Sequence, residues 1–408
     1  MCEVASCRLK NNCYDYLIML AIISVIFSGD MFGAFSLSRV VGFVYFVYYL
    51  FVVKKNKIQV LSFFLYAALF YSLLSALWVT DKHYYVIEFF NLLCYIGVFL
   101  LIYYCSLKAR RPIDSILKGW LLFAVLNLVV SFWEIYTGEH TSRGQFQADL
   151  MSVSIDGTRS YRVYAAVTYG NFNSLSIVLC LCLFMLILYL EYNHKAIYNI
   201  FSTILILLIF AVELINTSRG CLLSLVLSVI PLYMVVEKTK YKYFILFLVL
   251  LLFCFLWNEY SDMISFLLER KLQARANTGG IFQDPRWLLL DKGFEISKKW
   301  LFLGSGAGSM IHEYEMVHAV EYYAHNLWIQ ALVEYGLFFM LALFWGIAVF
   351  SIKCYLSSNS LIHLIGVILI VCWPILTIID DSYMKSFHWS FFASLFSIYH
   401  CSLNMKIR

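Results

Sequence analysis

Apolar runs of about 17–25 residues recur along almost the whole chain, and a helix of that length crosses the hydrocarbon core of a bilayer. Of the 408 residues, 62% are hydrophobic and 13% are charged, whereas about 25% of the residues in a soluble domain are charged. The alternating pattern of an outer-membrane β-barrel is absent. The sequence therefore predicts an all-α polytopic membrane protein, with residues 1–408 forming a single integral membrane domain.

We expect about 12 transmembrane helices. The predicted spans lie near residues 15–34, 37–53, 58–80, 84–105, 115–136, 170–190, 197–216, 220–236, 243–258, 324–350, 360–379 and 387–402. Two polar segments interrupt this series, residues 137–165 after the fifth span and residues 258–323 after the ninth. The two halves of the chain show no repeat, which counts against transporters built from two similar halves.

The Lys and Arg residues of the short connections indicate an orientation. If the N-terminus lies inside, the inside segments hold most of these residues, namely Arg8, Lys10, Lys54, Lys55, Lys57, Lys108, Arg110, Arg111, Lys195, Lys238, Lys240, Lys242, Lys353, Lys406 and Arg408. The short outside turns hold only Arg39, Lys82, Arg219 and Lys385. Because cytoplasmic loops collect Lys and Arg, both termini are predicted to be cytoplasmic and both polar segments to face outward.

The 12 cysteines do not indicate disulfides. None lies in either outward segment, so all are expected in spans or on the cytoplasmic side, where thiols stay reduced. No CxxC motif and no Cys/His metal spacing occurs in the sequence. We therefore expect no metal and no cofactor.

The second outward segment contains a predicted amphipathic helix near residues 285–300. Pro285 suits the first position of a helix, and Trp287, Leu288, Leu290 and Phe294 are predicted to form its apolar face at the outer interface. A Gly-rich stretch, residues 304–308, follows this helix. Such a stretch either forms a turn or approaches a phosphate through its backbone N–H groups, and because no strand precedes it, a turn is the better interpretation.

Arg219 stands between two apolar runs that almost nothing separates. An Arg at the membrane boundary is costly and is usually functional. Its place at the start of a span adds the positive end of a helix, and together they make an anion site. The alternative is an Arg in a tight outer turn whose side chain reaches up to water.

Arg286 and His325 open two further helical segments. Arg286 lies in the first turn of the predicted interfacial helix and can hold a phosphate through two parallel hydrogen bonds, although it could equally contact lipid headgroups. His325 precedes the tenth span and could accept a proton from a hydroxyl there, or it could be an ordinary interfacial histidine. Glu334, further along that span, is expected to be a buried structural partner.

Four more residues are predicted to bind substrate. Arg159 and Arg162 precede the sixth span, and Tyr323 and Asn326 flank His325. All four are candidates for contacts with a diphosphate or a glycan.

The order of these motifs resembles that of the bacterial O-antigen ligase and O-antigen polymerase superfamily. The resemblance rests on residues 217–220, Arg286, residues 304–308, His325-Asn326 and residues 334–336, and it is densest over about 160–340. It implies a metal-independent glycosyltransferase of the bacterial inner membrane with a periplasmic active site. Arg219 and Arg286 would bind the diphosphate leaving group, and His325 would be the base.

The resemblance also implies the substrates. The donor would be an oligosaccharide on undecaprenyl diphosphate, and membrane lipid would surround the site. The acceptor would be a sugar hydroxyl on another lipid-linked repeat unit for a polymerase, or on lipid A–core for a ligase. Residues 133–140 and 380–383 look similar to polysaccharide polymerases, which favours polymerisation. A chain-length regulator protein would be a further partner, and no nucleic acid is expected.

Outside enzymology, the alternatives are a transporter or flippase for lipid-linked sugars and, less favoured, a scaffold protein of an envelope assembly. The transporter is the stronger of the two. It would place charged residues along a central path, whereas here they cluster at the outer ends of the spans.

Overall fold

The computed structural model describes residues 12–28, 36–52, 60–141, 164–193, 195–216, 219–236, 254, 285–317, 326–379 and 385–406. At several helix ends, Arg219 and Arg286 included, it describes the backbone alone. Within these ranges the chain is helical and contains no strand. The predicted all-α fold is therefore confirmed.

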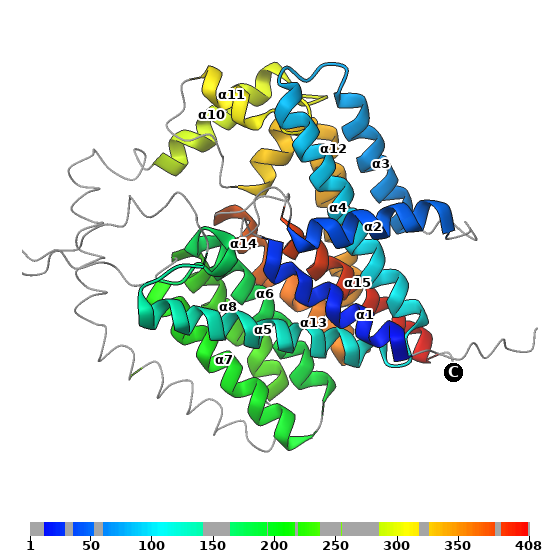
Figure 1. The fold of residues 1–408 in the computed structure, drawn as a ribbon, viewed down its shortest axis with the longest axis vertical. Coiled ribbons are helices and arrows are strands. Elements are labelled where there is room, and N and C mark those ends of the chain that lie inside the picture. The colour runs from blue at the N-terminus through cyan, green and yellow to red at the C-terminus, as the bar shows by residue number, and fades with distance from the viewer. Residues whose placement is uncertain are drawn as a thin grey trace, which may run out of the picture.

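The helices follow the predicted spans closely. They are α1 (Asn12–Ile23), η1 (Ser24–Ser28), α2 (Leu37–Val52), α3 (Val60–Ser75), α4 (Lys82–Lys108), α5 (Pro112–Thr137), η4 (Val167–Tyr169), α6 (Phe172–Tyr192), α7 (Ala196–Asn216), α8 (Arg219–Val236), α10 (Pro285–Lys299), α11 (Met310–Met316), α12 (Leu327–Tyr355), α13 (Ser360–Val367), η6 (Ile368–Cys372), α14 (Trp373–Ile379) and α15 (Ser386–Lys406). Figure 1 shows them gathered into one bundle, with α10 and α11 at one end. The predicted span at 243–258 falls almost wholly outside the described residues.

Within the described residues, 6 helical stretches are long and apolar enough to cross a membrane. They are Lys82–Lys108, Pro112–Thr137, Phe172–Tyr192, Ala196–Asn216, Leu327–Tyr355 and Ser360–Thr377. Shorter apolar helices occupy Asn12–Phe27, Leu37–Phe51, Leu65–Ser75 and Leu223–Val235. The protein is thus a multi-pass membrane protein, while the expectation of about 12 spans stays a prediction.

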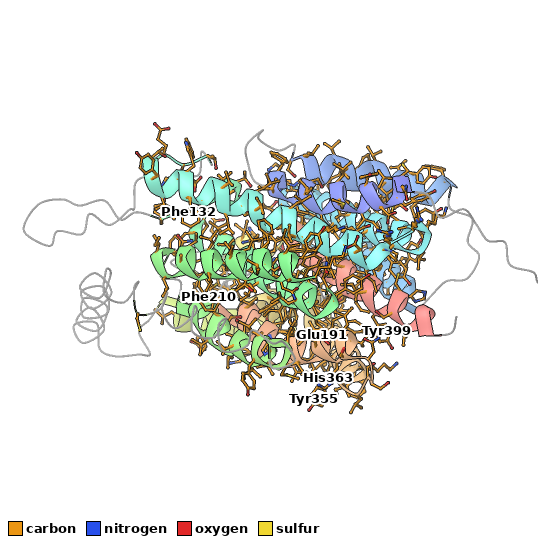
Figure 2. All side chains as sticks on the ribbon, turned by 90° about the horizontal axis from the view of Figure 1, so that it is seen from below. Phe132, Glu191, Phe210, Tyr355, His363 and Tyr399 are labelled. Atoms are coloured by element: carbon orange, nitrogen blue, oxygen red, sulfur yellow. The ribbon has the colours of Figure 1, made fainter. Side chains whose placement is uncertain are left out.

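Helices α5, α6 and α7 alternate in direction, so their ends lie at two opposite ends of the bundle (Figure 2). In Figure 2, Phe132 and Phe210, near the C-terminal ends of α5 and α7, lie toward one end. Tyr355, His363 and Tyr399 lie toward the other. We call the first the α5/α7 end. The starts of α6 and α8, which follow α5 and α7 along the chain, lie there too.

Helix α6 forms the centre of the bundle. Every residue from Ser174 to Leu190 is buried, and α6 packs against α5, α7, α8 and α13. A helix that is hydrophobic all round is typical of such a buried position.

Two glycines bring α2 and α4 into close contact. A Cβ atom at Gly42 would lie 2.0 Å from the carbonyl oxygen of Cys94, and one at Gly97 would lie 1.9 Å from the carbonyl oxygen of Gly42. Small residues at a helix crossing let two backbones approach closely, which is how membrane helices gain packing energy.

Helix α12 is broken at Gly336, where φ is 77° and ψ is 176°. The segment that follows α10 fills the break. Ser305 N–H donates to the carbonyl of Val333 at 2.8 Å, Gly306 N–H to that of Glu334 at 3.0 Å, and Leu337 N–H to that of Leu301 at 2.7 Å. These bonds satisfy backbone groups that the helix itself leaves free.

A second irregularity precedes Pro374, which has no N–H to donate. Residues Ile368–Cys372 form a π-helical turn just before Trp373 and Pro374. Two spanning helical stretches are therefore irregular, one at Gly336 and one before Pro374.

Candidate active site

Arg219 is the first residue of α8, as the sequence predicted. Helix α7 ends at Asn216, so only residues 217 and 218 separate the two helices. The first N–H groups of α8, for which a helix supplies no partner of its own, are therefore those of Arg219 and the residues after it. The side chain of Arg219 lies outside the described residues.

The side chain of Asn216 ties this turn to the segment before α6. Its Oδ1 accepts the N–H of Ala165 at 2.9 Å, and its Nδ2 donates to the carbonyl of Ala165 at 3.3 Å. Nδ2 also lies 3.5 Å from Oγ of Ser176, in the first turns of α6. One amide therefore links α6, α7 and residue 165.

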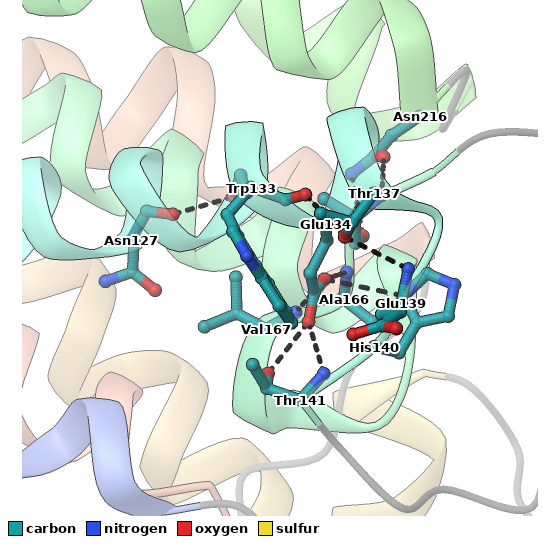
Figure 3. Close-up of polar contacts among 12 residues, drawn as sticks. Asn127, Trp133, Glu134, Thr137, Glu139, His140, Thr141, Ala166, Val167 and Asn216 are labelled. Atoms are coloured by element: carbon teal, nitrogen blue, oxygen red, sulfur yellow. Dashed lines mark hydrogen bonds and ion pairs between the residues drawn. The ribbon is translucent and has the colours of Figure 1, made fainter.

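Glu134, at the end of α5, holds the same segment from the other side. Its Oε2 accepts the N–H groups of Ala166 and Val167 at 2.7 and 2.8 Å. Its Oε1 accepts both the N–H and the hydroxyl of Thr141 at 2.8 Å. Figure 3 shows this carboxylate between the two stretches of backbone. Glu134 is completely buried, and these four bonds compensate for the loss of water.

His140 completes this cluster. Its Nδ1 lies 3.5 Å from Oε2 of Glu134, and its ring stacks on Tyr164 with centroids 4.2 Å apart. Both ends of the predicted 137–165 segment are therefore anchored to α5. Arg159 and Arg162, the candidate anion contacts in this segment, lie outside the described residues.

Helices α10 and α11 form a small unit with the first part of α12. Leu289, Ile296, Met310, Tyr314, Ile329 and Val333 are buried together in it. The Tyr314 hydroxyl donates to the carbonyl of Leu289 at 2.8 Å. Burial raises the pKa of Tyr314.

Arg286 is the second residue of α10, in the predicted first turn, and its side chain is not described. The apolar face predicted for the outer interface stays a prediction. Leu288 and Phe294 are exposed, whereas Leu289 and Ile296 are buried. The reason is Gly293, where a Cβ atom would lie 2.4 Å from Cγ2 of Ile329, so α10 packs on its glycine side.

Asn326 caps the start of α12. Its Oδ1 accepts the N–H groups of Trp328 and Ile329 at 3.0 and 3.1 Å. His325 is the residue directly before this cap and, like Tyr323, lies outside the described residues. The predicted substrate contact of Asn326 stays a prediction, because the described bonds of Oδ1 are those of a helix cap.

The first turn of α12 is joined to α14. Trp328 Nε1 donates to Oγ1 of Thr377 at 3.1 Å. Since α14 also packs against α8, a continuous series of helices connects α10, α12, α14 and α8. The helix that begins with Arg219 therefore belongs to the same part of the bundle as the start of α12.

Glu334 is buried, as predicted, with 2% of its surface exposed. Its carbonyl oxygen accepts the N–H of Gly306 beside the break in α12. The N–H groups of Gly304, Ser305, Gly306 and Ala307 all donate to protein oxygens. The Gly-rich stretch thus forms a turn against α12, which was the favoured interpretation of its sequence.

The structure adds a cation that we did not predict as a site residue. Lys385 Nζ donates to Oγ of Ser174 at 2.7 Å, in the first turn of α6. Glu134 and Asn216 were also absent from the predicted site. A carboxylate inside an apolar span, as at Glu134, is the sequence signal for a polar role.

Residues 204–344 match the family model described as O-antigen ligase. The matched region begins within α7, ends within α12, and includes Arg219, Arg286 and His325. A search of curated proteins finds no match. The resemblance of this membrane protein to the O-antigen ligase and polymerase superfamily is therefore confirmed over residues 204–344.

Proposed function

We propose that the protein is a membrane glycan polymerase. It would transfer an oligosaccharide from undecaprenyl diphosphate to a sugar hydroxyl of another lipid-linked repeat unit, at the periplasmic face of the bacterial inner membrane. The observation that supports glycosyl transfer is the family match, which spans all three residues predicted to be catalytic. The likeness of residues 133–140 and 380–383 to polysaccharide polymerases favours polymerisation.

The proposed reaction exchanges one bond for another at the anomeric carbon of the donor sugar. The acceptor hydroxyl oxygen attacks this carbon, and the bond from the carbon to the phosphate oxygen breaks. His325 takes the hydroxyl proton, and the diphosphate leaves with the bonding electrons. Negative charge develops on the leaving diphosphate, so fixed positive groups directed at it lower the barrier.

Two helix starts support the proposed roles of the arginines. Arg219 opens α8 and Arg286 lies in the first turn of α10. Each guanidinium is thus attached to the positive end of a helix, where free N–H groups and the helix dipole favour an anion. A planar guanidinium also matches two phosphate oxygens, which an ammonium group cannot do in the same way.

A ligase that transfers the glycan to lipid A–core is the second candidate function. The description of the matching family, O-antigen ligase, favours it. Both reactions need the same donor and the same leaving group, so they differ only in the acceptor.

The test uses a strain that lacks the gene, complemented with Arg219→Ala, Arg286→Ala or His325→Ala. We expect each variant to lose product by on the order of a hundredfold or more, the usual effect of removing a group that stabilises developing charge. Arg219→Lys should recover little, because it loses the paired hydrogen bonds. Lys298→Ala, an exposed cation on α10, is the matched control and should keep full product.

The glycans of the deletion strain distinguish the two candidates. Single repeat units on lipid A–core indicate a missing polymerase, whereas bare core with long lipid-linked polymer indicates a missing ligase. Wild-type glycan from Arg219→Ala, with the variant inserted at normal levels, would exclude the proposed role of Arg219.

A further inference from the structure

We infer that Glu134 is a positioning residue for the proposed transfer reaction. Together with Asn216 it fixes the backbone of residues 165–167 and, through it, the end of α7 that precedes Arg219. This inference rests on the proposed function. It assigns to the two residues the task of holding the arginine site in place.

The carboxylate of Glu134 accepts hydrogen bonds from three backbone N–H groups and one hydroxyl. One oxygen accepts the N–H groups of Ala166 and Val167, and the other accepts two donors of Thr141. A Gln at this position retains only one acceptor oxygen and turns an NH₂ group toward the other set of donors. It can therefore satisfy one stretch of backbone but not both.

The backbone conformation of Val167 indicates that its surroundings hold residues 165–167 in place. Its φ is 52°, and no other non-glycine residue of the described ranges has a positive φ. A β-branched residue avoids this region because its side chain clashes with its own backbone. Such strain persists only where the surroundings enforce it, and it collects at functional sites.

The side chain of Val167 explains why glycine does not stand here. Val167 is completely buried and belongs to the main hydrophobic core. Its neighbours are anchored too, because the Thr168 hydroxyl donates to the carbonyl of Ile26 and Tyr169 donates to Oδ1 of Asn127. The N–H bond to Glu134 holds the strained residue in this conformation.

Asn216 carries this constraint to Arg219. Its amide makes two hydrogen bonds to Ala165, the residue before Ala166. Arg219 follows Asn216 by three positions, which is at most about 11 Å of chain. A shift of residues 165–167 therefore moves the end of α7, which lies close to Arg219 along the chain.

The experiment measures transfer rates in membranes, with lipid-linked oligosaccharide extracted from the same organism as the donor. We expect Glu134→Gln to lower kcat by about a hundredfold, the cost of misplacing a catalytic group by about 1 Å. Adding Val167→Gly should restore most of kcat, because glycine adopts a positive φ without the carboxylate. If Glu134 served stability alone, the double variant should be less active than Glu134→Gln, since it also loses a buried side chain.

Two matched controls accompany these variants. Glu139→Gln changes an exposed glutamate of the same segment and should keep the wild-type rate. Asn216→Asp keeps the acceptor for Ala165 but loses the donor, so it should lower kcat as Glu134→Gln does. Asn193→Asp, a half-buried position at the other end of the bundle, should not.

Three results overturn the inference. They are a wild-type kcat for Glu134→Gln, a wild-type kcat for Asn216→Asp, and a double variant that is no faster than Glu134→Gln alone. If Arg219→Ala still abolishes product in those cases, only the inference fails. If Arg219→Ala is also active, the proposed function fails with it.

Discussion

The break in α12 predicts a large cost for a single methyl group. Gly336 has φ 77° and ψ 176°, a combination that in practice only glycine adopts. A Cβ atom at this position would lie 2.4 Å from the carbonyl oxygen of Phe302 and 2.6 Å from the N atom of Gly304. Both are backbone atoms, so Gly336→Ala must move the loop that fills the break.

The magnitude follows from two contributions. The backbone conformation itself costs an alanine about 1–3 kcal/mol. Moving the loop also weakens the three hydrogen bonds across the break, each worth about 0.5–1.5 kcal/mol. Gly336→Ala should therefore destabilise the protein by about 2.5–7.5 kcal/mol.

Thermal unfolding of the detergent-solubilised protein measures this effect. Gly346→Ala is the matched control, because it lies in the same helix and a Cβ atom there meets nothing within 4 Å. In a regular helix the same substitution stabilises by roughly 0.5–1 kcal/mol. We expect Tm to fall clearly for Gly336→Ala and not for Gly346→Ala. Equal Tm values for the two variants would refute the described role of the break.

Two further predictions concern other parts of the protein. Gly42→Ala should separate α2 from α4, because its Cβ atom would lie 2.0 Å from the carbonyl oxygen of Cys94; crosslinking between cysteines introduced on the two helices should become slower, and an unchanged rate would contradict the close contact. Burial raises the pKa of Tyr314, so the folded state favours the neutral phenol. The stability that it contributes is fully present below about pH 10 and is lost as the pH rises toward the folded-state pKa. Alkaline unfolding should therefore shift to higher pH in Tyr314→Phe, and identical curves would argue against this assignment.

The helices of this protein could be predicted from hydropathy because lipid allows few alternatives. Backbone groups in the hydrocarbon core need partners within the same segment, so a long apolar run forms a helix. The starts of α8 and α10 were predictable for a related reason. Arg219 follows an apolar run at once, and Pro285 suits the first position of a helix.

Contacts between distant segments could not be predicted in the same way. The packing face of α10 depends on Gly293 meeting Ile329, which is 36 positions further along the chain. The hydropathy of α10 registers apolar area and not shape, so it gives no sign of this packing face. The left-handed conformation of Val167 was equally invisible, since a valine gives no sign of a positive φ.

The candidate site likewise contains residues that could be predicted from the sequence and residues that could not. Arg219, Arg286 and His325 could be found from residue type and from position at a helix start. Glu134 and Asn216 act on backbone N–H and C=O groups, which every residue of the partner segment possesses. No pattern of side chains in residues 164–167 marks that partnership.

The burial of α6 has a consequence for how the protein is made. One of its neighbours, α13, begins at Ser360 and is synthesised long after α6 has left the ribosome. Until then lipid must cover the surface of α6 that α13 later occupies. Lipid chains are as apolar as leucine, so the replacement of lipid by α13 is driven by close packing and not by escape from water. The order of synthesis thus gives the C-terminal helices the task of closing the bundle around its central helix.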